Sequence, residues 1–335
     1  MKRPTEMMSG PEATGRSDMG RQAARRKGQS HAVVIATTGP QPCVTGAELD
    51  PARAFRHVGA ADHDEGRFAM TARIAALYRY PVKGLSAEPL AEAELTAAAH
   101  FPGDRLFAIE NGPSGFDTAA PEHQPKTKFL VLARQAALAR LKTRYETASG
   151  ELSISGEGID EVRASLASAE GRATIEAFFK RFFGRELAGE PKVLTAPAGF
   201  RFMDSRSGFA SIINLATVRA LEKEVGMTLD PLRFRANIYL EDLPAFAEFD
   251  WIDKPIDLGG AKVRGIKRIE RCAATTVNLK TAIRDVMIPA VLMRTYGHAD
   301  CGIYVGVDGA GRIAVGDAVA LHLAMAWQRV KETSR

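Results

Sequence analysis

Short β-prone segments separated by Gly, Pro, Asn or Asp recur from residue 72 to the end of the chain. They lie at 74–80, 90–95, 106–109, 129–132, 141–145, 152–154, 303–307, 313–315 and 316–321. Segments of this length, separated by turn residues, are typical of β-barrels and sandwiches. The pattern therefore predicts a β-rich α+β protein built around a barrel or a sandwich.

Two stretches have the period of a helix instead. Within 172–183, apolar residues recur at i, i+3, i+4 and i+7, and the same pattern appears within 215–225. Such spacing places apolar side chains on one helix face, where they pack against a core. Gly184 and Gly226 follow the two stretches and are plausible helix ends. We expect these helices to flank the β-structure.

Residues 1–70 differ in composition from the rest of the chain. Gly, Pro, Ser, Ala and Arg dominate, and only 33–35 resembles a core-forming run. A segment of this kind buries too little apolar surface to offset its ordering entropy, which predicts a disordered leader. Acidic residues among the arginines argue against a transit peptide. Met70 precedes the first predicted strand and is an alternative start of translation.

The composition limits the classes of protein to which this chain can belong. The chain has 335 residues, 45% of them hydrophobic and 25% charged, and contains no apolar run long enough to span a bilayer. We therefore expect no membrane partner. Its three cysteines form no CxxC pair, which favours a reducing, cytoplasmic location over a disulfide framework. The net charge of +5 is compatible with nucleic acid or an anionic cofactor.

A single cysteine, Cys272, lies between two β-prone runs at 263–269 and 275–277. This pattern predicts a strand, a short turn that carries the thiol, and a second strand. The preceding Arg271 is a neighbour that favours the thiolate. The alternative is that Cys272 is a small buried apolar residue, as most unpaired cysteines are.

Residues 231–240 alternate between apolar and polar side chains. The apolar set is Phe234, Ala236, Ile238 and Leu240, and the polar set is Arg233, Arg235, Asn237 and Tyr239. Period two predicts a strand with one cationic face. That face is either a binding surface or a solvated exterior.

Several familiar sites are excluded. The sequence contains no Walker loop, no GxGxxG after a strand, no HExxH and no G-x-S-x-G nucleophile elbow. The seven histidines have no metal-ligand spacing. These absences leave Cys272 and the basic residues as the candidate chemistry.

A set of short blocks, in order along residues 72–322, resembles the MOSC proteins that carry an N-terminal MOSC β-barrel domain. The blocks are 80–84, 103–105, 233–238, 248–251, Arg271-Cys272 followed by 275–277, Tyr304, and Gly316-Asp317. The family includes the mitochondrial amidoxime-reducing component and bacterial reductases of N-hydroxylated bases. The resemblance implies a small N-terminal β-barrel domain at 71–190, then a MOSC β-barrel domain at 191–325 with flanking helices.

The resemblance also implies a molybdenum–pyranopterin cofactor, with Cys272 as the catalytic residue and the protein ligand to the metal. A soft thiolate suits a sulfur-rich molybdenum centre. The cofactor's phosphate needs cationic and N–H donors. The residues that match the family's cofactor contacts are Lys83, Arg105, Ser205, Ser207, Arg235, Asn237, Arg271 and Tyr304. Pyridoxal phosphate binding is a further family-level implication.

The activity implied by the resemblance is molybdenum-dependent reduction of N-hydroxylated or N-oxygenated small molecules. The chain lacks the cysteine spacing of a plant-type iron–sulfur cluster, so electrons would come from a separate ferredoxin-, flavodoxin- or cytochrome b5-like protein. One alternative is a carrier that holds sulfur as a persulfide on Cys272. A nucleic-acid-binding module is the other, and few aromatic residues interleave the basic ones to support it.

The sequence departs from the family pattern in places. Gly84 stands where many relatives carry a serine after the lysine, and 116–121 lacks the Thr-Gln-Arg often found there. The loop 204–209 lacks a proline that relatives often have. These departures concern the substrate and the phosphate side of the site more than metal ligation.

Overall fold

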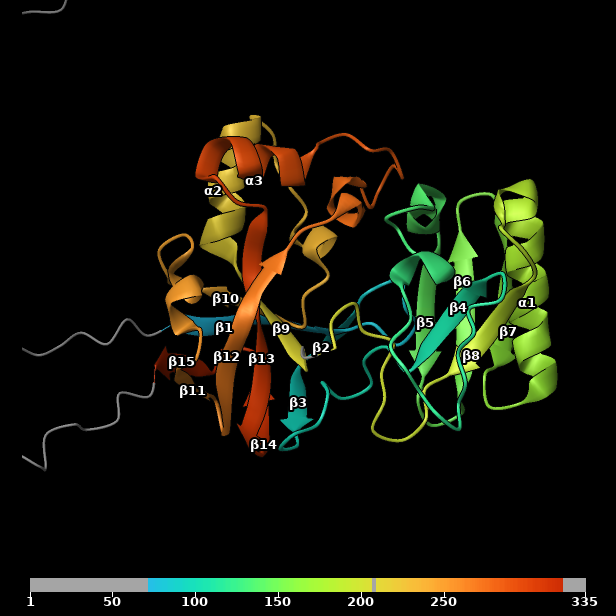
Figure 1. The fold of residues 1–335 in the computed structure, drawn as a ribbon, viewed down its shortest axis with the longest axis horizontal. Helices are drawn as coiled ribbons and strands as arrows, with labels where there is room; N and C mark the ends of the chain where they lie inside the picture. The colour runs from blue at the N-terminus through green and yellow to red at the C-terminus, as the bar shows by residue number, and fades with distance from the viewer. Residues whose placement is uncertain (1–71, 207–208, 322–335) are drawn as a thin grey trace, which may run out of the picture. The chain divides into compact units, whose positions relative to one another are not determined.

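The computed structural model of the chain describes residues 72–206 and 209–321 (Figure 1). The predicted leader at 1–70 and Ser207 lie outside the described residues. All described residues belong to one compact unit within 65–335. Most of the regular elements in these ranges are strands, and three are α-helices. None of these helices is both long and apolar enough to cross a lipid bilayer.

Seven strands close into a barrel, which confirms the predicted β-rich fold. The closed order is β1 (Ala72–Arg79), β10 (Ile238–Glu241), β9 (Ala210–Asn214), β13 (Asp300–Gly309), β12 (Ala261–Glu270), β11 (Pro255–Leu258) and β15 (Ala318–Leu321), which pairs with β1 again. Only β9 and β10 pair in parallel; the other pairs in the ring are antiparallel. The first strand of the described chain therefore closes a barrel made otherwise of strands beyond residue 209.

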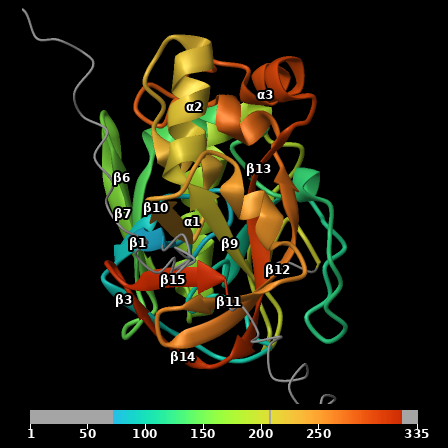
Figure 2. The same cartoon turned by 90° about the vertical axis from the view of Figure 1, so that its left-hand side faces the viewer.

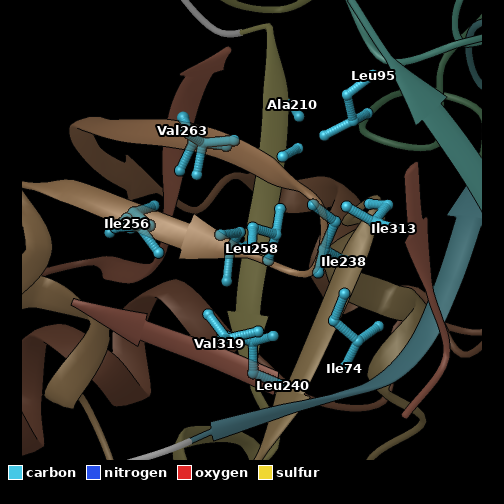
Figure 3. Close-up of a cluster of buried hydrophobic side chains, with 14 of the residues drawn as sticks. Ile74, Leu95, Ala210, Ile238, Leu240, Ile256, Leu258, Val263, Ile313 and Val319 are labelled. Carbon is cyan, nitrogen blue, oxygen red and sulfur yellow. The ribbon is translucent and has the colours of Figure 1, made fainter. Parts of the chain in front are cut away.

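Alternating side chains fill the barrel interior. Along β12, buried Ala261, Val263 and Gly265 alternate with exposed residues, as period two requires. Ile74 of β1 and Val319 of β15 point into the same cluster, which Figure 3 shows between the strands. Burial of this apolar surface is the main stabilising contribution to the barrel.

Two smaller sheets form the part of the structure between the first strand and residue 195. One pairs β4 (Phe107–Asn111) with β8 (Pro191–Thr195), and the other is the meander β5 (Lys142–Glu146), β6 (Glu151–Gly156) and β7 (Ile159–Ser165). The meander contains the predicted hairpin. Helix α1 (Ala169–Phe183) packs on these sheets through Ile175, Phe178 and Phe179, as its spacing predicts.

Two short pairings complete the sheets around the barrel. Strand β2 (Glu88–Leu90) adds to β1, and β3 (Glu92–Leu95) pairs with β14 (Gly311–Ala314). Helices α2 (Leu215–Val225) and α3 (Ile288–Tyr296) lie beside each other at one end of the barrel (Figure 2). Asn214 caps the start of α2 by accepting a hydrogen bond from the Ala216 amide, and Gly226 ends it in the left-handed region.

The strand predicted at 231–240 is wrong over its first half. Residues Pro231–Phe234 form a 3-10 turn, and the regular strand begins only at Ile238. Asp230 accepts a hydrogen bond from the Leu232 amide and Pro231 has a helical φ, so the local turn signal overrides the alternation. Arg235 has a φ of 53°, outside the β-region. Arg235 and Asn237 therefore do not share a strand face.

The strand predicted after Cys272 is also wrong. Strand β12 ends at Glu270, and Ala273–Thr276 form a 3-10 turn that begins directly after the cysteine. The Thr275 hydroxyl donates to the Cys272 carbonyl at 2.9 Å and the Thr276 hydroxyl to the Ala273 carbonyl at 2.8 Å. These local bonds give threonines an alternative to strand pairing. At 129–132, only Phe129 makes a β-bridge, so that predicted strand is wrong too.

Candidate functional site

A cavity of about 560 Å³ opens beside Cys272. Its walls come from the segments around Lys83, Lys126 and Leu132 and, later in the chain, from β12, β13 and the turn after Cys272. Eight basic residues line it: Lys83, Arg105, Lys126, Arg233, Arg235, Lys267, Arg268 and Arg271. The lining carboxylates are Asp204, Glu270 and Asp300. This excess of cations makes the cavity suitable for a polyanion.

The structure brings together seven of the nine residues matched to the family's site. Those that line the cavity are Lys83, Arg105, Ser205, Arg235, Arg271, Cys272 and Tyr304. Asn237 does not line it: its fully buried amide accepts from Ser211 and donates to the Tyr78 carbonyl. Asn237, directly before β10, thus links β9 to β1. The ninth, Ser207, lies outside the described residues.

The side chain of Arg271 fixes the backbone next to Cys272. Its Nε donates to the Cys301 carbonyl at 2.7 Å, and its Nη1 donates to the Phe234 carbonyl at 2.9 Å. The guanidinium is therefore engaged by carbonyl groups of two other segments. Cys272 itself is half-buried at the cavity wall. The structure thus gives Arg271 a positioning role in addition to its positive charge.

Two further guanidinium groups stack on one aromatic ring. Arg105 and Arg235 each lie 4.4 Å from the centroid of the Tyr80 ring, a cation–π geometry. The fully buried Asp104 balances part of this charge by pairing with Arg105 at 2.5 Å. Asp104 also accepts from the Tyr80 amide at 2.8 Å, which ties the ring to the arginine. Both cations are thereby held in fixed orientations.

Arg235 retains an unsatisfied donor. Its Nη1 donates to the Leu85 carbonyl at 2.8 Å, whereas its buried Nη2 has no hydrogen-bond partner. Burial, together with repulsion from Arg105, lowers the pKa of Arg235 to about 10. A buried donor without a partner is costly unless a ligand completes it. This atom is therefore a strong candidate for contact with a bound anion.

Lys83 and Asp204 form an ion pair at the cavity wall. The Lys83 ammonium also donates to the Phe202 carbonyl at 2.9 Å. Burial lowers the pKa of Lys83, and Asp204 opposes that shift only in part. Burial raises the pKa of Asp204, but attraction from Lys83, and then from Lys126, outweighs it and lowers the value to about 2. Asp204 is therefore ionised at neutral pH.

Lys126 was not anticipated from the sequence. It begins the 3-10 turn Lys126–Lys128 and lines the cavity together with Cys272. Burial lowers the pKa of Lys126, but interaction with the sulfur of Cys272 and with Asp204 outweighs it, and the pKa is raised. Nothing in the local sequence marks this residue, because only the tertiary fold brings its loop to the thiol. The same holds for Lys267 and Arg268 of β12.

Gly84 follows Lys83 with a φ of +85°. A Cβ atom placed on it would lie 2.4 Å from the Leu130 carbonyl oxygen. The backbone conformation and the close approach both require glycine. The serine that the family resemblance leads us to expect here does not fit this backbone.

A second cavity of about 260 Å³ shares Gly84, Leu132 and Arg235 with the first. Its walls are mostly aliphatic and include Leu85 and Leu141. The site therefore combines a cationic cavity with a smaller, more apolar one, and Arg235 lines both.

The donor set fits an anionic cofactor that brings most of its own metal ligands. In the described ranges, no group of three or more His, Cys, Asp or Glu side chains is placed to hold a metal ion. The thiol of Cys272 is the soft donor at the cavity wall. The unsatisfied Nη2 of Arg235 and the excess of cations suit the anionic end of such a group.

Two family models match the described part of the chain. Residues 71–188 match the MOSC N-terminal beta barrel domain and residues 203–320 match the MOSC domain. Mitochondrial amidoxime reducing component 2 of Homo sapiens is 23% identical over 290 residues, which cover 76% of this chain and 84% of that protein. Mitochondrial amidoxime-reducing component 1 of Xenopus laevis is 28% identical over 120 residues. That second alignment spans about a third of each protein, 32% of this chain and 34% of the relative.

Among solved structures, the YUAD protein from Bacillus subtilis is 12% identical with a TM-score of 0.36, and the match covers 75% of this chain and 96% of that one. YiiM from Geobacillus stearothermophilus is 21% identical with a TM-score of 0.28, over 34% of this chain and 54% of that one.

Proposed function

Since the chain belongs to the MOSC family, with a MOSC N-terminal β-barrel domain followed by a MOSC domain, we propose that it is a molybdenum-cofactor-dependent reductase of N-hydroxylated or N-oxygenated small molecules. The observation that carries the proposal is the half-buried Cys272 thiol at the wall of a cavity lined by eight basic residues. The names of the relatives, amidoxime-reducing components, support the reaction class.

Within this proposal, Cys272 binds molybdenum, and Lys83, Arg105, Ser205 and Arg235 hold the anionic part of the pyranopterin cofactor. The bound cofactor supplies the two-electron chemistry that removes an oxygen atom from nitrogen. Ser207 remains a predicted contact. Asn237 acts indirectly, because its amide holds the strands behind the cavity.

The remaining residues position the Cys272 sulfur and complete the wall around it. Arg271 fixes the backbone at Cys272 through the Cys301 and Phe234 carbonyls. Lys126 adds a positive charge to the cavity wall beside the sulfur, where an anionic cofactor would bind. Burial raises the pKa of Tyr304, so its phenol stays protonated at neutral pH and can donate a hydrogen bond into the cavity.

The overall reaction converts R–NHOH, two electrons and two protons to R–NH2 and water. We propose that the electrons come from a separate ferredoxin-, flavodoxin- or cytochrome b5-like protein. The small number of cysteines and the absence of a CxxC pair in the sequence favour the cytoplasm as the place of action. Pyridoxal phosphate is the weaker cofactor candidate, because two of the three lysines that line the cavity are engaged: Lys83 by Asp204 and the Phe202 carbonyl, and Lys126 by the Cys272 sulfur.

The test is metal analysis of the protein purified from a host that makes molybdopterin. We expect near-stoichiometric molybdenum and metal-dependent reduction of an amidoxime or hydroxylamine in the wild type. Cys272→Ala should lose both. Cys301→Ala is the matched control, because Cys301 is fully buried and burial raises the pKa of its thiol to about 12.

Protein that stays free of molybdenum in that host would contradict the reductase. If it instead carried a labile sulfane sulfur that Cys272→Ala removes, the persulfide carrier would take its place. The half-exposed thiol beside Lys126 is compatible with that second chemistry.

A further inference from the structure

Exposed apolar side chains gather in one short segment near the cavity. Among the described residues, the most exposed large hydrophobic side chains are Ile283 (62%), Met287 (59%) and Met293 (54%). They lie in the segment before α3 and in α3 itself. Single exposed apolar residues are ordinary, but three within eleven positions mark a contact surface.

The same segment is positively charged. Lys280, Arg284 and Arg294 are exposed within it. Its carboxylate, Asp285, is neutralised by Arg233, which donates to both carboxylate oxygens at 2.7 Å. Met287 is the N-cap residue of α3 and Arg294 lies in the last turn of that helix. The segment thus combines an apolar centre with an uncompensated basic border.

Arg284 joins this segment to the Cys272 turn. Its Nη1 donates to the Ala273 carbonyl and the Thr276 hydroxyl, each at 2.8 Å. Its Nη2 donates to the Leu132 and Ala133 carbonyls at 3.1 and 2.9 Å. Leu132 and Ala133 also line the large cavity. The exposed segment is therefore the outer side of the wall that carries Cys272, and Figure 1 shows it running from the region of the 3-10 turns to α3.

We propose that this surface, with Ile283 and Met287 at its centre and Lys280 and Arg294 at its border, docks an acidic electron-carrier protein. The proposal rests on the proposed function, which requires two electrons from outside the chain. Complementary charge would steer an acidic carrier to this face, and the apolar centre would hold it. Docking here places the carrier's redox group next to the wall of the site. Each turnover of R–NHOH to R–NH2 and water consumes two protons from solvent and two electrons, which a one-electron carrier delivers in two successive docking events.

A basic and apolar surface also suits an anionic membrane. The proximity to Cys272 favours the protein partner, because a lipid surface would supply no electrons there. The experiment must therefore distinguish binding of a carrier protein from binding to anionic vesicles.

The experiment measures binding of three purified acidic carriers to the full chain by calorimetry: a plant-type ferredoxin, a flavodoxin and a soluble cytochrome b5 domain. The test variant is the double substitution Ile283→Asp with Met287→Asp. Met287 occupies the N-cap of α3, where aspartate is favourable, so the fold should be retained. The control is Val315→Asp, an exposed aliphatic residue (48%) in the turn between β14 and β15.

We expect at least one carrier to bind the wild type and Val315→Asp equally, with an affinity that falls as salt is raised. The double variant should bind it about tenfold more weakly or worse. The proposal is overturned if no carrier binds, if the double variant binds as well as the control, or if the double variant loses only binding to vesicles of phosphatidylserine and phosphatidylcholine.

A second measurement distinguishes failure of the proposed docking surface from failure of the proposed function. Substrate reduction driven by dithionite needs no carrier and should be equal in the wild type, the double variant and the control. Absence of dithionite-driven reduction in the molybdenum-loaded wild type would refute the proposed function, whereas carrier binding would still test the surface.

Discussion

Arg105 donates a hydrogen bond of 3.1 Å from its Nη2 to the backbone carbonyl of Arg235. Two arginines 130 positions apart are thereby in direct contact, although like charges repel. Tyr80 lies under both guanidinium groups and Asp104 balances one of them. The protein thus holds an under-compensated cationic pair in place before any ligand arrives, as preorganised anion sites do.

Removing one member of this pair should abolish anion binding. Arg235→Gln eliminates the buried charge and the unsatisfied Nη2. With pyrophosphate as the probe, we expect the wild type to gain thermal stability and the variant to gain little, because a ligand stabilises only the state that binds it. Arg163→Gln on the exposed side of β7 is the control. An equal shift of the melting temperature in all three proteins would contradict this role.

Asp204 should make stability depend on acid pH. Its folded pKa of about 2 lies below the usual carboxyl value of 3.8, so its contribution to stability is present above pH 4 and is lost as pH falls toward 2. After a discount for its partial exposure, we expect Asp204→Asn to cost about 1 kcal/mol at pH 7 and almost nothing at pH 2. Urea unfolding across this range measures the difference. The exposed Asp160→Asn should leave the pH profile unchanged, and a parallel offset for Asp204→Asn at every pH would be against the prediction.

Glu248 is a fully buried carboxylate between α2 and the barrel. It accepts from the Asn214 amide at 3.1 Å and the Thr217 hydroxyl at 3.2 Å. Burial raises its pKa, so its contribution to stability is largest at acid pH and declines as pH rises through the folded pKa. Glu248→Gln should remove this pH dependence at little cost. Glu248→Ala removes the acceptor of the Thr217 hydroxyl and leaves the Asn214 amide only the Pro244 carbonyl, and it should cost about 2–4 kcal/mol.

The two Glu248 variants are compared by denaturant unfolding at pH 5 and pH 8. Equal destabilisation by Gln and Ala would show that the carboxylate's charge, rather than its shape and hydrogen bonds, is what the fold requires.

Gly84→Ser introduces the serine expected from the family resemblance, yet it should destabilise this protein. The Cβ would lie 2.4 Å from the Leu130 carbonyl oxygen, and the φ of +85° is strained for any side chain. We expect a loss of about 2 kcal/mol or more in urea unfolding. Gly115→Ser is a matched control, since it has a φ of +79° but open space around the Cβ position. If the two variants were equally stable, the close approach would carry no cost.

The two long helical stretches could be predicted from the sequence because their signals are local. The apolar period at 172–183 and 215–225 and the closing glycines correspond to α1 and α2. The strands with clear boundaries, such as 74–80, were predictable for the same reason. Closure of the barrel pairs β1 with β10, which lies far from it in the chain. The sequence pattern therefore could only narrow the fold to a barrel or a sandwich.

The errors at 231–240 and 275–277 have one physical origin. Alternation and β-branched residues favour a strand only if no local hydrogen bonds compete. Asp230-Pro231 starts a helical turn in the first segment, and the Thr275 and Thr276 hydroxyls close one in the second. Arg235 still lines the cavity, but it does so from a left-handed turn instead of a strand face, so its place there does not depend on the predicted strand.

The walls of the large cavity come from segments that lie far apart in the chain, from Lys83 to Tyr304. No fragment that ends before β12 could form it. A ligand bound there would contact these distant segments at the same time. Because it binds only the folded state, its binding free energy adds to the free energy needed to separate the segments. The holoprotein should therefore resist proteolysis and heat as a unit, and loss of its ligand should loosen the junction between the small sheets and the barrel first.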